Sequence, residues 1–125
     1  MIENEISYII RGCLFKVYNA LGPGLLESAY QAALTYELRQ AGLDVVCQLG
    51  LPFQYETIKL DVGYRIDILV NDKVIIEVKS VETLGDVHYK QVITYLKLSN
   101  RKLGLLVNFN TSKIEESIKR IVNNL

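Results

Sequence analysis

The feature that most constrains the fold is a pair of apolar segments, 65–70 and 74–79, separated by the turn residues Asn71 and Asp72. Side chains alternate in both segments, which is the period of a β-strand and predicts a hairpin. A two-residue turn would set each carboxylate of the hairpin against an aliphatic side chain. A three-residue loop over 71–73, or an equivalent bulge, makes one face wholly apolar, and we predict this register.

The predicted register also brings two acids together. Its pairs are Ile66 with Val78, Ile68 with Ile76, Val70 with Val74, Leu69 with Ile75 and Asp67 with Glu77. Lys79 follows Glu77 by two residues and therefore projects from the same face. Adjacent carboxylates repel by about 1–4 kcal/mol at 4 Å, and a hard cation such as Mg²⁺ or Mn²⁺ turns the repulsion into attraction. The structural alternative is a raised pKa on one acid, or a salt bridge to Lys79 or Arg65.

The remaining elements are predicted from periodicity and from helix-breaking residues. Apolar residues at helical spacing predict helices over 3–21, 25–41 and 86–99. Alternating or continuous apolar residues predict strands at 45–49 and 103–109, with 53–60 as a further short strand or two edge pieces after an interruption at Gly50 and Pro52.

A last helix is predicted after Ser112, because Glu115 three residues later completes a capping box. Its apolar residues are Ile114, Ile118, Ile121 and Val122. The element order is then α-α-β-β-β-β-α-β-α, which predicts one layered α/β domain over residues 1–125.

Composition excludes several classes of protein. No stretch approaches the roughly 18 apolar residues of a membrane span, and the acidic N-terminus does not match a secretory signal. Cys13 and Cys47 lie outside any CxxC spacing, so we expect two small buried hydrophobic residues in a reducing cytoplasm. The 14 basic and 14 acidic residues balance, which disfavours a constitutive nucleic-acid binder but leaves room for a local basic patch.

Two more groups of residues are candidates for a site. Glu27 and Tyr30 share a face of the second helix; Glu27 also suits a solvated first turn, and Tyr30 suits partial burial. His88, Gln91 and Tyr95 form a stripe at i, i+3 and i+7 on the helix after the second hairpin strand. His88 lacks the paired His or Cys of a zinc site, and Gln91 either orients water or phosphate or is an ordinary surface residue.

The motif Gly24-x-x-Glu27-x-x-Tyr30, followed by RID, EVKS and HxxQxxxYL, resembles the bacterial and archaeal GxxExxY family of the PD-(D/E)XK nuclease-like superfamily. The resemblance covers roughly 5–122. It implies a restriction-endonuclease-like α/β core, a mixed four-stranded sheet flanked by helices in the order α-β-β-β-α-β, with an additional N-terminal helix. The proline of the name is absent, since Arg65-Ile66 precede Asp67.

The resemblance implies a role for each matching residue. The implied catalytic residues are Lys79, Glu77, Asp67, Glu27 and Gln91. The implied ligands of Mg²⁺ or Mn²⁺ are Asp67, Glu77 and the Val78 carbonyl, with Glu27 as a further ligand or water contact. Residues expected at the substrate are Tyr30, Arg65, His88 and Tyr95.

We therefore expect a cytoplasmic Mg²⁺- or Mn²⁺-dependent nuclease that hydrolyses phosphodiesters, with DNA ahead of RNA as partner. The alternative is a catalytically silent module that keeps the nuclease fold and binds nucleic acid or protein. A homodimer and a separate protein partner are compatible with either reading.

Overall fold

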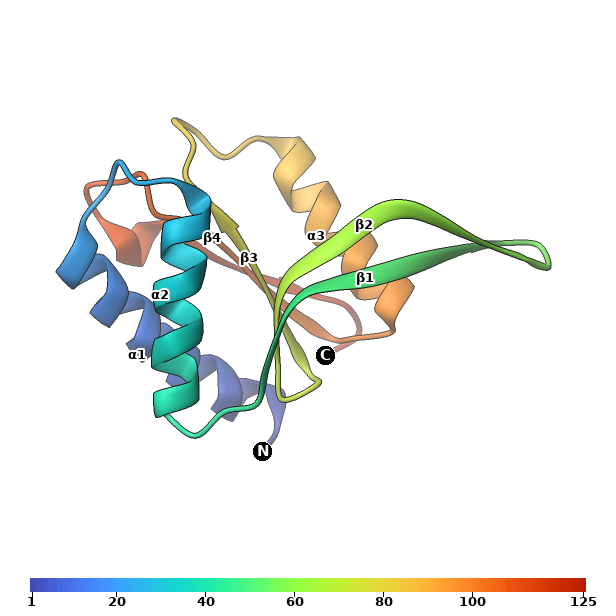
Figure 1. Ribbon diagram of the computed structural model, residues 1–125, viewed down its shortest axis with the longest axis horizontal. Coiled ribbons are helices and arrows are strands. Elements are labelled where there is room, and N and C mark those ends of the chain that lie inside the picture. Colours follow the sequence, from blue (N-terminus) through green and yellow to red (C-terminus); the bar gives the residue numbers. More distant parts are fainter.

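Three helices enclose a five-stranded sheet from both faces in the computed structural model, which describes residues 1–125 (Figure 1). The elements in chain order are α1 (Glu3–Leu21), α2 (Glu27–Gln40), β1 (Val45–Tyr55), β2 (Ile58–Val70), β3 (Val74–Lys79), α3 (Asp86–Ser99), β4 (Leu103–Asn108), a 3₁₀ turn (Ile114–Glu116) and β5 (Ile118–Val122). The three helices predicted over 3–21, 25–41 and 86–99 and the two hairpin strands are thus present. None of the helices is both long enough and apolar enough to cross a membrane.

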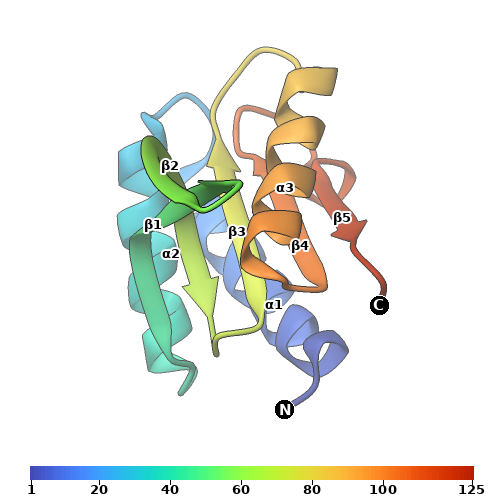
Figure 2. The ribbon, with the colours of Figure 1, turned by 90° about the vertical axis from the view of Figure 1, so that its right-hand side faces the viewer.

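The helices form two layers with the sheet between them. Figure 2 shows α3 in front of the sheet, with α1 and α2 behind it. The larger core lies under α1 and α2, where the apolar stripe of α1 meets Ile68, Ile76 and Val107 of the sheet. The smaller core lies under α3, where Val92 and Leu96 pack on the opposite face.

The sheet is mixed, as predicted. Its strand order is β1-β2-β3-β4-β5, and only the β3–β4 pair is parallel. A parallel pair needs a crossover connection, and α3 supplies it between β3 and β4. Contact between α3 and β4 is close at Gly104, where a Cβ atom would lie 2.6 Å from Val92 Cγ1.

The β2–β3 hairpin confirms the predicted three-residue loop. Its ladder pairs Ile68 with Ile76, Leu69 with Ile75 and Val70 with Val74. The regular ladder ends at Ile68 and Ile76, so the two predicted pairs beyond it are not formed as ladder pairs. Beyond this point β2 separates from β3 and stays with β1.

The separated part of β2 and its partner β1 form a long arm that projects from the body of the molecule (Figure 1). The interruption predicted at Gly50 and Pro52 is instead a register shift between Leu51 and Phe53 within a continuous strand. β1 is an edge strand, and a proline without an N–H is tolerated at an edge or a bulge.

The prediction of a last helix is wrong. Ser112 and Glu115 bracket only a single 3₁₀ turn, and Ile118–Val122 form β5, antiparallel to β4. The sheet therefore has five strands rather than four. The spacing of Ile118 and Ile121 fits a helix locally, but pairing along β4 satisfies the backbone of this otherwise open edge.

Candidate active site

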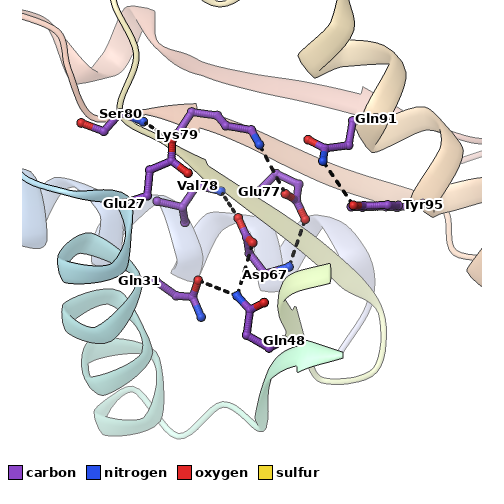
Figure 3. A network of polar contacts seen from close by, with 10 residues as sticks. All are labelled: Glu27, Gln31, Gln48, Asp67, Glu77, Val78, Lys79, Ser80, Gln91 and Tyr95. Atoms are coloured by element: carbon purple, nitrogen blue, oxygen red, sulfur yellow. Dashed lines mark hydrogen bonds and ion pairs between the residues drawn. The ribbon is translucent and has the colours of Figure 1, made fainter. Parts of the chain in front are cut away.

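Asp67 and Glu77 lie side by side where the β2–β3 ladder ends. The Asp67 N–H donates to Glu77 Oε1 at 3.0 Å, and the Val78 N–H donates to Asp67 Oδ2 at 2.9 Å (Figure 3). Leu69 and Ile75, each two residues from one of the acids, belong to the core under α3. The two carboxylates accept N–H groups that the separating strands no longer pair.

Glu77 is almost completely enclosed. It is 1% exposed, whereas Asp67 is half-buried. Burial, and then the negative charge of Asp67, raises the pKa of Glu77 from 4.5 to about 8. Near neutral pH, without a cation, the Glu77 carboxyl is therefore mostly protonated.

Lys79 extends toward the same pair from the end of β3. Its Nζ lies 3.9 Å from Glu77 Oε2, and its side chain is 14% exposed. This distance is too long for a hydrogen bond. The attraction lowers the pKa of Glu77 by less than burial and Asp67 raise it. Lys79 therefore leaves the repulsion between the acids largely uncompensated.

The donor set fits a hard divalent cation. Two carboxylates come together, and the molecule has no group of three or more His, Cys, Asp or Glu residues that could hold one ion. Mg²⁺ commonly takes one or two carboxylates and keeps several waters. A buried acid beside a second acid is the observation that supports such an ion, since both would then be ionised without net repulsion.

Glu27 reaches the end of β3 from the first turn of α2. Its Oε2 accepts the Ser80 N–H at 3.1 Å, and Ser80 Oγ donates to the Leu25 carbonyl at 2.7 Å. These bonds tie the start of α2 to the residue after Lys79. Glu27 is exposed and does not form a three-acid cluster with Asp67 and Glu77.

Gln48 is a neighbour of Asp67 that the sequence did not reveal. It lies on β1 with a backbone φ of 52°. Its Nε2 donates to Gln31 Oε1 at 3.0 Å and lies 3.5 Å from Asp67 Oδ1 (Figure 3). A glutamine between apolar strand residues resembles any solvent-facing polar residue, so residue type gave no signal for this contact.

Two of the three predicted α3 residues come together at the site. Gln91 Nε2 donates to Tyr95 Oη at 3.2 Å (Figure 3). Burial raises the pKa of Tyr95, and the charges of Glu77 and Asp67 add to the rise. The Tyr95 ring meets Tyr64 edge-on with centroids 6.0 Å apart. Tyr95 is mostly buried, so Gln91 is the more accessible of the two.

His88 lies at the start of α3 and has a local contact. Its Nδ1 accepts the Gly85 N–H at 3.0 Å, which satisfies a free donor at the helix N-terminus. The structure therefore gives His88 a helix-capping contact instead of a contact with Gln91 or Tyr95.

Tyr30 lies in the core rather than on a substrate surface. It is 0% exposed, and its ring stacks on Phe109 with centroids 4.3 Å apart. Its hydroxyl donates to the Gly22 carbonyl and accepts the Leu25 N–H. These bonds close the turn between α1 and α2, which accounts for a tyrosine at this position without a role in recognition.

Arg65 remains accessible at the base of the arm. Its side chain is 44% exposed, lies across Gly50, and forms an ion pair of 3.6 Å with Asp61. It lies two positions before Asp67 along β2, with Ile66 between them.

Comparison with known proteins gives one match. A family model described as the PD-(D/E)XK nuclease superfamily matches residues 4–121. No curated protein matches, and no solved structure matches.

Proposed function

Because the chain belongs to the PD-(D/E)XK nuclease superfamily, we propose that it hydrolyses phosphodiester bonds of nucleic acid with Mg²⁺ or Mn²⁺. The observation that carries the proposal is the position of Asp67 and Glu77, joined at the end of the β2–β3 ladder with Lys79 beside them. We also propose, on the motifs around Glu27 and Gln91, that the chain falls within the GxxExxY group.

The residues proposed to hold the cation are Asp67, Glu77 and the Val78 carbonyl, with Glu27 as an outer contact through water. A divalent cation at such a site polarises the phosphate and lowers the pKa of a bound water. The half-buried Asp67 is the more open of the two acids. We therefore expect substrate and water to reach the site from the side of Asp67.

Lys79 is proposed as the catalytic residue that supplies a positive charge from the protein, in addition to the metal ion. Its ammonium is held beside Glu77 in a largely dry environment, because only 14% of the side chain is exposed. A fixed positive charge there offsets the negative charge that develops on the phosphate oxygens. Gln91, held by Tyr95, is proposed to orient the attacking water or a phosphate oxygen.

Substrate contacts are proposed for Arg65, with DNA as the first substrate to test. The guanidinium suits a phosphate, because its donors match the spacing of two phosphate oxygens. The formal charge of the chain is zero, so we expect affinity to come from this local contact and the cation rather than from a broad basic surface.

The test is single-turnover cleavage of labelled DNA and RNA with Mn²⁺. We expect Glu77→Ala and Lys79→Ala to slow cleavage at least a hundredfold. The matched controls are Glu56→Ala and Lys59→Ala, which remove one acid and one lysine from the exposed arm and should cleave at the parent rate. Equal rates in all five proteins would reject the assigned roles.

A second candidate is a binding module without catalysis. The observation that favours it is that both acids already accept backbone N–H groups, while five surface cavities of the molecule are lined by other residues. The two functions differ in how nucleic-acid binding depends on divalent metal. Equal binding in EDTA and in Mn²⁺, without cleavage, would favour the binding module.

A further inference from the structure

We propose that Gln48, held by Gln31, is a positioning residue that sets the orientation of the Asp67 carboxylate. The effect on cation binding rests on the proposed function, whereas the orientation of Asp67 is a property of the protein without a cation. The proposal adds β1 and the middle of α2 to a site otherwise built from β2, β3, α3 and the first turn of α2.

The backbone of Gln48 gives the first argument. Its neighbours Cys47 and Leu49 pair regularly with Ile68 and Ile66 of β2. Gln48 lies between them, opposite Asp67, with φ at 52°. A non-glycine residue at positive φ costs free energy, and such residues persist where the surroundings impose them. Within β1, Gln48 is the residue with a positive φ, and its side chain is the one that meets Asp67.

The hydrogen bonds give the second argument. The side-chain nitrogen of Gln48, Nε2, faces two acceptors. They are Gln31 Oε1 at 3.0 Å and Asp67 Oδ1 at 3.5 Å. The other Asp67 oxygen accepts the Val78 N–H at 2.9 Å. Each oxygen of the carboxylate thus faces a donor from a different strand, so the rotation of the group is fixed from both sides (Figure 3). The 3.5 Å contact is at the long limit of a hydrogen bond, so we expect it to add little to the stability of the fold.

The position of Gln31 gives the third argument. It lies one helical turn after Glu27, so both project from one face of α2. Glu27 binds the end of β3 through Ser80, and Gln31 binds β1 through Gln48. Helix α2 therefore contacts strands on both sides of Asp67 and keeps the amide of Gln48 in place.

The informative substitution is Gln48→Asn. Asparagine tolerates positive φ better than most residues and keeps an amide, but its side chain is one methylene shorter. Gln48→Gly removes the amide and relieves the backbone. Both variants should fold with a urea midpoint equal to or above that of the parent. A residue that only stabilises the fold would instead lower this midpoint when shortened.

The readout that needs no cation is hydrogen exchange of the Val78 amide, with the Val107 amide of β4 as reference. The Val78 N–H bonds to Asp67 Oδ2, so loss of Asp67 orientation should speed its exchange at least fivefold relative to Val107. The matched control is Gln54→Ala, a glutamine of the same strand whose amide contacts only the nearby turn. It should leave the ratio unchanged.

The second readout is Mn²⁺ affinity by calorimetry. We expect Gln48→Asn and Gln48→Gly to raise the Kd at least fivefold. Gln31→Leu should give the same kind of loss, and adding it to Gln48→Gly should cause no further change, because Gln31 acts through Gln48. If the losses from Gln31→Leu and Gln48→Gly are fully additive, Gln31 does not act through Gln48.

The outcomes separate the two proposals. If the parent binds no Mn²⁺, the cation site is rejected, and the Val78 exchange alone decides whether Gln48 orients Asp67. If the parent binds Mn²⁺ but Gln48→Asn shows unchanged Val78 exchange and unchanged affinity, the positioning role is overturned while the cation site stands.

Discussion

Asp67 and Glu77 are linked by a bond from backbone to side chain: the N–H of Asp67 donates to Oε1 of Glu77 at 3.0 Å. The two strands have separated here, so a carboxylate completes the hydrogen bonding that a facing carbonyl would supply in a continued ladder. This bond holds two acids close together, and burial together with the charge of Asp67 raises the pKa of Glu77. The first two predictions follow from this raised pKa.

The first prediction concerns pH and stability. The pKa of Glu77 rises from 4.5 in the unfolded chain to about 8 in the fold, so the native state holds a proton that the unfolded chain has lost between these values. Stability therefore falls as pH rises from about 4.5 to about 8. In EDTA we expect a fall on the order of 2–4 kcal/mol from this acid, measured by urea unfolding at pH 5, 7 and 9.

Glu77→Gln should remove most of this fall and be more stable than the parent at pH 9. Its amide can accept the same backbone N–H without a charge. Glu56→Gln, in the exposed turn of the arm, should keep the pH dependence of the parent. A Glu77→Gln curve parallel to that of the parent would contradict the assignment.

The second prediction concerns proton release on metal binding. Mn²⁺ at a hundredfold excess over its Kd should stabilise the parent by about 2.7 kcal/mol. Because a bound cation requires ionised Glu77, binding at pH 7 should release close to one proton. Calorimetry in two buffers of different ionisation enthalpy measures this release. Equal heats in both buffers, or a Glu77→Gln protein that binds as tightly as the parent, would exclude Glu77 as a ligand.

The third prediction separates Lys79 from the ligands. Lys79→Met should slow cleavage by about 10²–10³-fold yet bind Mn²⁺ as tightly as the parent or more tightly. The reason is that a positive charge 3.9 Å from Glu77 is removed. Lys59→Met, on the arm, should change neither quantity. If Mn²⁺ binding is lost together with cleavage, Lys79 acts on the structure of the site instead.

The fourth prediction tests the placement of Tyr30. Tyr30→Phe keeps the stacking on Phe109 but loses the two hydroxyl bonds to Gly22 and Leu25. We expect a loss of about 1–3 kcal/mol in unfolding free energy, with no change in cleavage rate at temperatures where the protein is folded. Tyr36→Phe, at an exposed site, should be neutral. Slower cleavage with unchanged stability would restore a substrate role to Tyr30.

The fifth prediction concerns the contact of α3 with β4. A Cβ atom on Gly104 would lie 2.6 Å from Val92 Cγ1, so Gly104→Ala should destabilise the protein by about 1–3 kcal/mol. Gly12→Ala is the matched control, because Gly12 lies in α1 with open space around it. It should stabilise the protein by about 0.5–1 kcal/mol. Urea unfolding of both variants measures the difference, and equal effects would contradict the packing described.

The parts of the fold in which apolar residues recur with a regular period could be predicted from the sequence. Alternation along Ile68, Val70, Val74 and Ile76 was enough to choose the hairpin register, because a slip of one residue exchanges the two faces. The same argument placed Asp67 beside Glu77. The C-terminal strand was missed because the spacing of its isoleucines suits a helix, and only the open edge of β4 decides between the two.

Other parts of the site depend on contacts that no local pattern encodes. Gln48 adopts a positive φ without being glycine, so its residue type predicts neither its conformation nor its contact with Asp67. The hydroxyl of Tyr30 and the ring of His88 each find a backbone group within a few residues. Motif matching cannot distinguish such structural bonds from recognition of a ligand.

The hydrogen bonds at the end of the β2–β3 ladder show which residue types the fold requires at positions 67 and 77. At both positions the backbone asks only for an oxygen acceptor, which Asn and Gln provide as well as Asp and Glu. Asn and Gln at these two positions would keep the backbone bonds and would stabilise the fold, because buried neutral groups do not repel each other. The backbone bonds alone therefore do not account for two acids at the end of this ladder, whereas the proposed cation would pair with both of them.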